Sequence, residues 1–478
     1  MSHGSAKTSS GISEIDAQPL PNDFVNYFPW ACGQFQLGIE ISISKMVQSE
    51  YVGSNIVGAK ARRLKLLTNP LKAHISRMEI VSETGMKKFS ENFEADPVIK
   101  LTAFCNRSDK LIHLRIEKTE FHIPRKLLKI LGLFVRFHPY LVTFTIKTKI
   151  DKYVVYELSK LISISNISEL YLDGCYVREC NFDVLLCESC GLKILSLARC
   201  SLTDTILKTI TDKLDLQEPG ARLLTSLNLS SNRITDVGAR YVAKALRSNR
   251  RLVHLNLSGN SIGDEGAFAI FATMLEFVPT EDELVKTRVR RFQYLIDKIE
   301  MVNNLVVQFT EEEFDKLRRK TTKASSKGLF PEYNVPRISR AALDPGTIRR
   351  IHDRAGIQAD MTLGKFIDPF YPFILRKDVV CSYGSNALLS LNLAYNNLTV
   401  LSVRKSLETL LYQKSLNRRP RGLINLNLEG NNFPVACPEL HDINSLMEEA
   451  VAETSASNSP VYKKKASSKS DYSIQLNV

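Results

Sequence analysis

The feature that most constrains this chain is a recurring pattern, Leu-x-x-Leu-x-Leu-x-x-Asn/Cys-x-Leu. Two adjacent copies are very clean, one beginning at Leu224 and the other at Leu252, with Ile at the last place of each. Further copies begin at Ile167, Leu192, Leu388 and Leu423, and those at Leu111 and Leu141 fit less well. Internal repetition of this kind predicts a stack of similar units that share one continuous core, so the chain length does not by itself indicate how many domains are present.

Each part of the pattern has a physical role. The Leu-x-Leu centre predicts a short strand whose alternate side chains point inward. The Asn or Cys at the ninth place lies where the strand turns away, and its side chain can bond backbone groups that would otherwise be buried and unpaired. The residues expected to have this structural role are Cys175, Cys200, Asn232, Asn260, Asn396 and Asn431.

Helical segments follow the strands, as at 235–246 and 263–275, where apolar residues recur at helical spacing. The first six copies begin 25 to 32 residues apart, which leaves room for a strand and a full helix in each. We therefore expect an α/β leucine-rich-repeat solenoid of the ribonuclease-inhibitor type, with a curved parallel sheet and outer helices, interrupted by an insertion.

The insertion lies between the sixth and seventh copies. Residues 280–283 form a capping box, and an apolar stripe at helical spacing follows it on a predicted long helix. The stripe consists of Val285, Val289, Phe292, Ile296 and Ile299. We expect this stripe to pack on the solenoid, although it could also bind a partner helix. A second capping box at 310–313 predicts a short new helix through Leu317, and the basic stretch 316–350 predicts a solvated loop.

The sequence predicts six segments. They are a disordered N-terminus (1–28), an N-terminal capping region (29–107), six repeats (108–278), a helical and basic insertion (279–386), two repeats with a C-terminal cap (387–454), and a disordered basic tail (455–478).

Charge and cysteine content bear on the cellular setting. The formal net charge is +13, which favours acidic partners. Nine cysteines, an odd number, and a polar N-terminus without a secretory apolar segment predict a reducing compartment, and we expect the cytoplasm. No uninterrupted apolar stretch is long enough to predict a membrane span.

The repeats resemble the ribonuclease-inhibitor class, which is shared with Ran GTPase-activating proteins and many intracellular scaffolds. Residues 165–445 are more closely similar to the leucine-rich repeat-containing protein 71 family. That family also breaks its array after a Gly-Asp-x-Gly-Ala repeat like 263–267, and its last copy precedes a segment like 433–438. Its insert is Lys-rich and of low complexity, whereas this one is more varied. The resemblance implies expression associated with cilia and flagella, and hence an axonemal location.

Five cysteines crowd into a short segment: Cys175, Cys180, Cys187, Cys190 and Cys200. Cys187 and Cys190 form a CxxC pair, which leaves a metal or redox site open, but we favour core packing because Cys175 and Cys200 occupy ninth places and the others fall on the intervening helix. We predict no metal and no cofactor. Histidines are scattered, with surface positions expected for His113, His138, His254 and His352, so we predict no catalytic residues.

Two surfaces are candidates for binding. On the concave face, the third and fifth places of the pattern supply Arg115, Tyr171, Asn228, His254, Asn256, Asn392 and Asn427. In the insertion, the basic candidates are Lys316, Arg318, Arg319, Lys320 and Lys323. The concave face is nearly neutral, and aromatic residues are not interleaved with the basic runs, so nucleic acid is a poor fit to either surface.

These observations predict a non-enzymatic protein–protein interaction scaffold, with an axonemal assembly implied by the resemblance. The expected partner is a protein, acidic or associated with tubulin, and no small-molecule substrate or membrane span is expected. Two alternatives stay open: a GTPase-activating protein of the Ran-specific type, and a cytosolic adaptor unrelated to cilia. The Ran-specific proteins have an unbroken array and an acidic tail, whereas this array is broken and its tail is basic.

Overall fold

The computed structural model describes residues 18–47, 79–80, 97–187, 189–216, 218–325, 343–434 and 436–457. The described chain divides into two compact units. Unit 1 comprises the N-terminal residues up to Leu275 together with those from Gly384 onward, and unit 2 comprises Glu276–Tyr383. No helix in the described ranges is long and apolar enough to cross a membrane.

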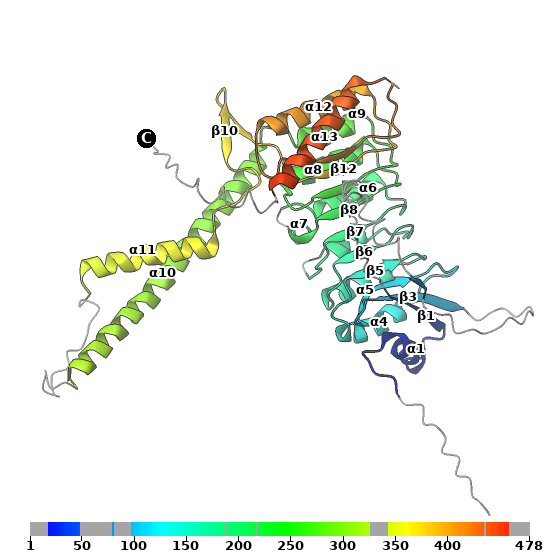
Figure 1. Ribbon diagram of the computed structural model, residues 1–478, viewed down its shortest axis with the longest axis horizontal. Helices are drawn as coiled ribbons and strands as arrows, with labels where there is room; N and C mark the ends of the chain where they lie inside the picture. The colour runs from blue at the N-terminus through cyan, green and yellow to red at the C-terminus, as the bar shows by residue number, and fades with distance from the viewer. Residues whose placement is uncertain are drawn as a thin grey trace, which may run out of the picture. The chain divides into compact units, whose positions relative to one another are not determined.

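Unit 1 is built on a sheet in which eight repeat strands run parallel, each hydrogen-bonded to the next (Figure 1). These strands are β4 (Leu111–Ile116), β5 (Thr143–Ile146), β6 (Glu169–Tyr171), β7 (Ile194–Ser196), β8 (Ser226–Asn228), β9 (His254–Asn256), β12 (Ser390–Asn392) and β13 (Asn425–Asn427). One strand comes from each predicted copy of the pattern, so the predicted mostly parallel sheet is confirmed.

The first leucine of the Leu-x-Leu segment, at the fourth place of the pattern, faces the core in every clean copy. Leu227, Leu255 and Leu391 lie at the same register and are at most 2% exposed. Alternation along a strand sends the neighbouring third- and fifth-place side chains to the opposite face. The sheet therefore has one face against a continuous apolar core and one open face that carries polar side chains.

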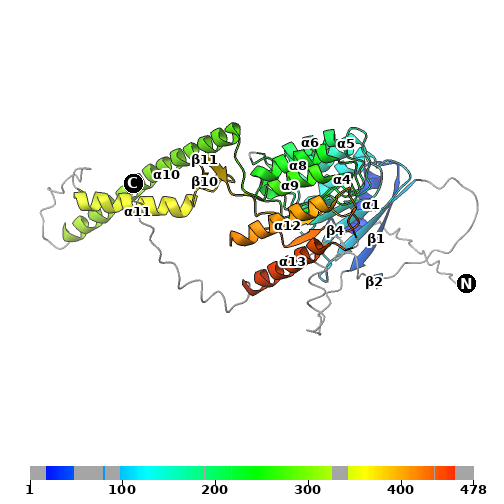
Figure 2. The same ribbon diagram turned by 90° about the horizontal axis from the view of Figure 1, so that it is seen from above.

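Helices between the strands cover the core side of the sheet (Figure 2). They are α4 (Arg125–Phe134), η1 (Val135–Phe137), α5 (Lys152–Ser163), η2 (Phe182–Leu186), α6 (Asp204–Asp212), α7 (Gly220–Leu223), α8 (Asp236–Ser248), α9 (Asp264–Ala272), α12 (Val400–Ser415) and α13 (Pro438–Ser457). Between β6 and β7 the connection is the short 3-10 turn η2, so Cys180, Cys187 and Cys190 flank a turn and do not lie on a helix as predicted.

The N-terminal end of the sheet departs from the repeat geometry. Helix α1 (Phe24–Gln34) packs beside β1 (Glu40–Val47), which pairs in parallel with β3 (Val98–Cys105) and antiparallel with β2 (Glu79–Ile80). Strand β3 then pairs antiparallel with β4. The prediction that residues 1–28 are disordered is wrong at its C-terminal end, since α1 begins at Phe24, where Asp23 caps it by accepting from the backbone N–H of Asn26.

The described part of unit 2 contains two helices and a hairpin. Helix α10 (Glu281–Ser325) is continuous for 45 residues, and α11 (Pro345–Leu363) packs beside it. Strands β10 (Phe373–Arg376) and β11 (Val379–Ser382) pair antiparallel. The capping box at 280–283 forms, because Thr280 N donates to Glu283 Oε2 at 2.8 Å and Glu283 N donates to Thr280 Oγ1 at 3.3 Å.

Two predictions about the insertion are wrong. No helix starts at Thr310, since α10 runs through it and the Thr310 hydroxyl donates to Val306 O at 2.6 Å inside the helix. The stretch 316–350 is not a loop throughout, because α10 extends to Ser325 and α11 begins at Pro345. The predicted C-terminal disorder from 455 also begins too early, since α13 ends at Ser457.

Candidate functional site

The fifth-place asparagines on the open face have a structural role. The side-chain Oδ1 of each accepts the backbone N–H two residues further on, at 3.1 Å for Asn228, 3.0 Å for Asn256 and Asn392, and 2.9 Å for Asn427. This bond holds the turn that leaves each strand. Asn228 also donates to Ser196 Oγ at 2.9 Å. Each of these predicted binding residues therefore uses at least one polar atom in a hydrogen bond within the protein.

The N-terminal part of the open face brings aromatic and charged side chains together. The Arg115 guanidinium lies 4.7 Å from the centre of the Phe104 ring, and the His113 ring stacks on the same phenylalanine with centroids 4.5 Å apart. Tyr171 is half-buried on β6, and burial, reinforced by Glu169 and Asp173, raises its pKa. Both Arg115 and Tyr171 thus lie on the open face, each beside a carboxylate, Glu117 for Arg115 and Glu169 for Tyr171.

His254 is partly buried on β9, and burial lowers its pKa, which favours the neutral ring near pH 7. Within the described chain its Nδ1 is buried without a hydrogen-bond partner. Its neighbours in the sheet register are Ser226 and Ser390. A neutral imidazole between two serine positions can exchange hydrogen bonds with a partner, and His254 therefore stays a candidate contact residue.

The other histidines differ in their environments. His352 is exposed on α11, whereas His138 is 7% exposed, so its predicted surface position is wrong. Its ring packs edge-on against Phe24 with centroids 5.3 Å apart. Burial lowers the pKa of His138, against the opposing effect of a backbone hydrogen bond at Pro21. The first helix thus buries a residue that looked like a surface polar group in the sequence.

The ninth-place residues form a ladder between adjacent copies. Asn232 Oδ1 accepts from the backbone N–H groups of Cys200 and Leu202 at 3.0 Å each, and Asn260 accepts from those of Asn232 and Ile234 at 3.2 Å each. Asn396 and Asn431 repeat this arrangement in the last copies. Cys175 and Cys200 donate their thiols to backbone carbonyls of the preceding copy. All six residues predicted to have a structural role occupy such positions.

A second ladder, which the sequence reasoning missed, links the N-termini of successive helices. Asp204 accepts from Thr235 N and Gly238 N at 2.9 and 3.0 Å, and Asp236 accepts from Gly263 N and Gly266 N at 2.7 and 2.9 Å. Asp264 continues the series with Thr399 N at 2.9 Å. The sequence did contain a sign of this ladder, the Asp-x-Gly-Ala shared by the starts of α8 and α9. However, the backbone groups that Asp236 bonds lie one full repeat further along the chain.

All nine cysteines lie within the described part of the chain. All nine are free thiols, and no group of three or more potential ligands gathers in the described part of the chain. Seven of the nine are buried, while Cys187 and Cys437 are half-buried. Most therefore lie in the core, and the Cys187–Cys190 pair stands apart because its sulfur atoms lie 3.1 Å from each other.

The basic candidates lie at the C-terminal end of α10. Lys316 pairs with Glu313 at 2.8 Å, and Arg318 and Arg319 are exposed on the same helix. Lys320 and Lys323 belong to the helix by their backbone, while their side chains lie outside the described residues. The structure therefore places these residues on a helix, where their charges have a defined spacing.

The apolar stripe of α10 is exposed. Its five side chains range from 40% exposed at Ile296 to 67% at Phe292. At ~100° per residue, the centre of the stripe lies about 120° around α10 from Phe309, on the face that packs against α11. That other face carries the small cluster of Phe309 with Ile351 and Ala355. Unit 2 therefore leaves the stripe uncovered by its own second helix.

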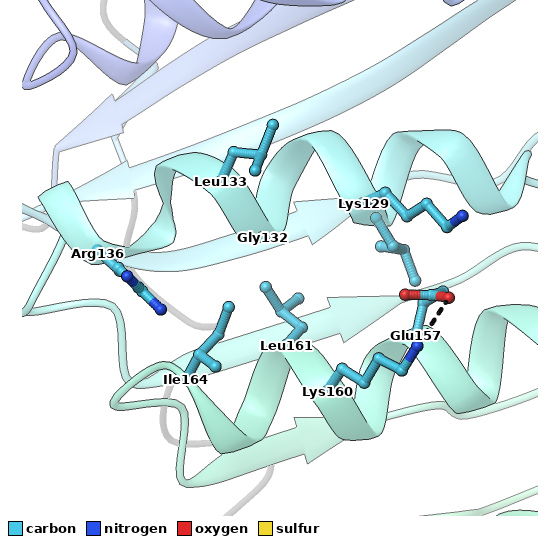
Figure 3. A pocket seen from close by; sticks show the side chains of 9 residues that line it. Lys129, Gly132, Leu133, Arg136, Glu157, Lys160, Leu161 and Ile164 are labelled. Atoms are coloured by element: carbon cyan, nitrogen blue, oxygen red, sulfur yellow. Dashed lines mark ion pairs between the residues drawn. The ribbon is translucent and has the colours of Figure 1, made fainter.

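A groove between α4 and α5 is a further candidate that the sequence did not indicate (Figure 3). It encloses about 440 Å³, with Leu161, Ile164 and Leu133 as apolar lining and Lys129 and Arg136 at its edge. Glu157 and Lys160 also line it and form an ion pair at 3.5 Å. The groove thus combines an apolar floor with a basic rim.

Comparison with known proteins locates part of the repeat array independently. A family model described as a leucine-rich repeat matches residues 220–243 and 248–271. These segments contain β8, most of α8, β9 and most of α9, which belong to the two cleanest copies in the sequence. No curated protein matches the chain. The chain therefore contains leucine-rich repeats, arranged as a mostly parallel sheet of many strands with helices between them.

Proposed function

We propose that this protein is a non-enzymatic scaffold of the ribonuclease-inhibitor repeat type, and that it binds a helical segment of a partner protein along the exposed stripe of α10. Leucine-rich repeats commonly serve protein–protein interaction, which supports the general role. The single observation that carries the more specific proposal is the exposure of five large apolar side chains on one face of a continuous helix.

The size of the apolar surface supports binding. Side chains exposed to this degree present on the order of 500 Å² of apolar area, which is at the upper end for a patch on a soluble monomer and is often functional. Residues spaced at four and three positions along α10 match the anchor pattern by which one helix packs into the surface of another. A partner helix is therefore a better fit than an extended peptide.

The stripe is held ready for binding by the rest of unit 2. Asp368, whose side chain is 1% exposed, pairs with Arg290 Nε at 2.6 Å and accepts from Thr287 Oγ1 at 3.2 Å. Tyr294 Oη donates to Gly364 O at 2.8 Å. These contacts tie the opposite face of α10 to the segment after α11, so binding along the stripe requires little further ordering of the helix.

The experiment compares captured proteins from cells expressing the full chain or its variants. In the stripe variant, Val289, Phe292 and Ile296 are replaced by alanine, which keeps the helix but removes the apolar anchors. The matched control replaces Gln293 and Asn304 by alanine, two exposed positions elsewhere on α10. We expect partners to be retained by the control and reduced at least about tenfold in the stripe variant. Equal capture by both variants would refute the docking role.

A narrower proposal follows from the resemblance to the leucine-rich repeat-containing protein 71 family, namely that the scaffold belongs to a ciliary or flagellar axoneme. The basic end of α10, with Arg318 and Arg319 exposed, would suit an acidic partner such as a glutamate-rich tubulin tail. Immunostaining of ciliated cells and extraction of purified axonemes test it. An even distribution in non-ciliated cells, with none in axonemes, contradicts the location without affecting the scaffold proposal.

A further inference from the structure

The CxxC pair occupies the one connection between successive repeat strands, among those the structure describes, where a 3-10 turn stands alone in place of a helix. Turn η2 ends at Leu186, and Cys187 follows it directly. The backbone N–H of Cys190 donates to Cys187 O at 3.0 Å, which folds the two cysteines toward each other. Their sulfur atoms are 3.1 Å apart, so a disulfide requires only a small movement of the side chains.

The two thiols have different environments. Cys187 is half-buried, and Ser189 Oγ lies 3.5 Å from its sulfur. Burial opposes its ionisation, but hydrogen bonds from Ser189, from the Cys190 thiol and from the backbone at these two residues outweigh it and lower the pKa of Cys187. Cys190 is buried, and burial together with the neighbouring Cys187 raises its pKa to about 12. Cys187 is therefore the better nucleophile and Cys190 the protected partner.

Surrounding contacts hold Cys190 in place. Its sulfur lies 3.6 Å from Ser159 O and 3.9 Å from Ser163 Oγ, both on α5. Ser163 Oγ is also 2.7 Å from Ser189 Oγ, which ties the CxxC turn to that helix. The site is thus anchored to α5 at the Cys190 sulfur, while the Cys187 side chain is partly exposed.

The remaining cysteines do not share this arrangement. Cys175 and Cys200 are fully buried, and burial raises the pKa of each. Cys437 is half-buried like Cys187, but its sulfur contacts Glu439 Oε2 at 3.3 Å. Cys437 has no second cysteine near it in the sequence, so it offers an internal reference of similar burial without a CxxC partner.

We propose that Cys187 and Cys190 form an oxidation site that reacts with peroxides and closes to a reversible disulfide. The Cys187 thiolate attacks one oxygen of the peroxide, the O–O bond breaks, and Cys187 becomes a sulfenic acid as hydroxide leaves and is protonated to water. The Cys190 sulfur then attacks the Cys187 sulfur, the S–O bond breaks, and the Cys190 proton leaves with the hydroxyl as water. Two thiols are oxidised by two electrons, and one molecule of hydrogen peroxide is reduced to two water molecules.

The test uses the full chain, reduced and then exposed to hydrogen peroxide, with free thiols blocked before peptide mass analysis. We expect a peptide that links Cys187 to Cys190 and lacks two hydrogens, restored by dithiothreitol. Cys190→Ser should stop the reaction at the sulfenic acid of Cys187, which dimedone traps. In the same variant Cys187 should react at least about tenfold faster than Cys437.

The control variant is Cys437→Ser, which should leave the yield and rate of the Cys187–Cys190 disulfide unchanged. Cys187→Ser should abolish the disulfide while the far-ultraviolet circular dichroism stays that of the parent. The proposal is overturned if peroxide oxidises Cys437 as fast as Cys187, or if the two CxxC cysteines remain thiols while others react.

Discussion

The ninth-place ladder predicts a large loss of stability on Asn260→Ala. Asn260 is 8% exposed, and its Oδ1 accepts from the backbone N–H groups of Asn232 and Ile234 at 3.2 Å each. Its Nδ2 donates to Leu229 O at 3.1 Å and Leu257 O at 2.8 Å. Both carbonyls keep another donor after the substitution, because Asn232 and Asn396 also reach them.

Two buried N–H groups are therefore the atoms left without partners. Each orphaned buried donor costs about 1–3 kcal/mol, so Asn260→Ala should lower the free energy of unfolding by about 4 kcal/mol. Asn256→Ala in the same copy is the matched control. It removes one bond, from Ser258 N at 3.0 Å, at a half-buried site, and should cost about 1 kcal/mol.

The assay is urea-induced unfolding followed by circular dichroism at 222 nm, on both variants and the parent chain. Equal slopes with different midpoints would show that the substitutions change stability and not the surface exposed on unfolding. The prediction is wrong if the two variants lose the same free energy of unfolding to within about 0.5 kcal/mol. That result would mean that the ninth-place asparagine contributes no more to stability than the fifth-place asparagine.

Three further predictions concern the helix N-termini and the insertion. Gly266→Ala should destabilise by about 1–3 kcal/mol, measured by urea unfolding, because an added Cβ would lie 2.8 Å from Ala239 Cβ and 2.9 Å from Ile262 Cγ2, whereas Gly191→Ala has nothing within 4 Å and should be neutral. Partial burial opposes ionisation of Asp264, but hydrogen bonds from Ser402 and Thr399 outweigh it and lower its pKa. The stabilisation is therefore present above the unfolded pKa of about 3.9 and is lost as the pH falls through the folded value, so Asp264→Asn should be more destabilising at pH 7 than at pH 3. Deleting Glu276–Tyr383 and joining Leu275 to Gly384 with a short linker should leave unit 1 folded. The two ends to be joined lie close together, since a Cβ added to Gly384 would be 2.4 Å from Leu275 O. Loss of the far-ultraviolet circular dichroism signal of the folded chain would contradict this.

The sequence was most informative where a feature repeats locally. Strand positions follow from the alternation around Leu227 and Leu255, and both the ninth-place asparagines and their role follow from the need to pair buried backbone groups. The helix-terminal ladder was not found, because Asp236 bonds Gly263 and Gly266 across a whole repeat, and no local pattern indicates that distance.

The insertion shows why a local signal can mislead. Thr310-x-x-Glu313 has the composition of a helix start, but inside a continuous helix the N–H of residue 313 already has an intrahelical acceptor, and the Thr310 hydroxyl turns back to Val306 O. A capping box indicates a helix end only where the preceding residues leave backbone groups unpaired. The candidate residues of the open face were likewise predicted by position, but the structural bonds of Asn256 and Asn392 became visible only in the structure.

The pairing of β9 with β12 has a kinetic consequence. Six copies can form from contacts between neighbours in sequence, whereas Asn396 reaches Ile262 across 134 positions. Closing so long a loop is entropically costly and slow. Unit 2 shortens it, because Phe277 and Ser382 exchange two backbone hydrogen bonds, at 3.1 and 2.8 Å, and so bring the ends of the insertion together. Folding of the insertion should therefore precede addition of the last two strands, and the rate at which the sheet is completed is set by a segment whose described strands, β10 and β11, form a separate sheet.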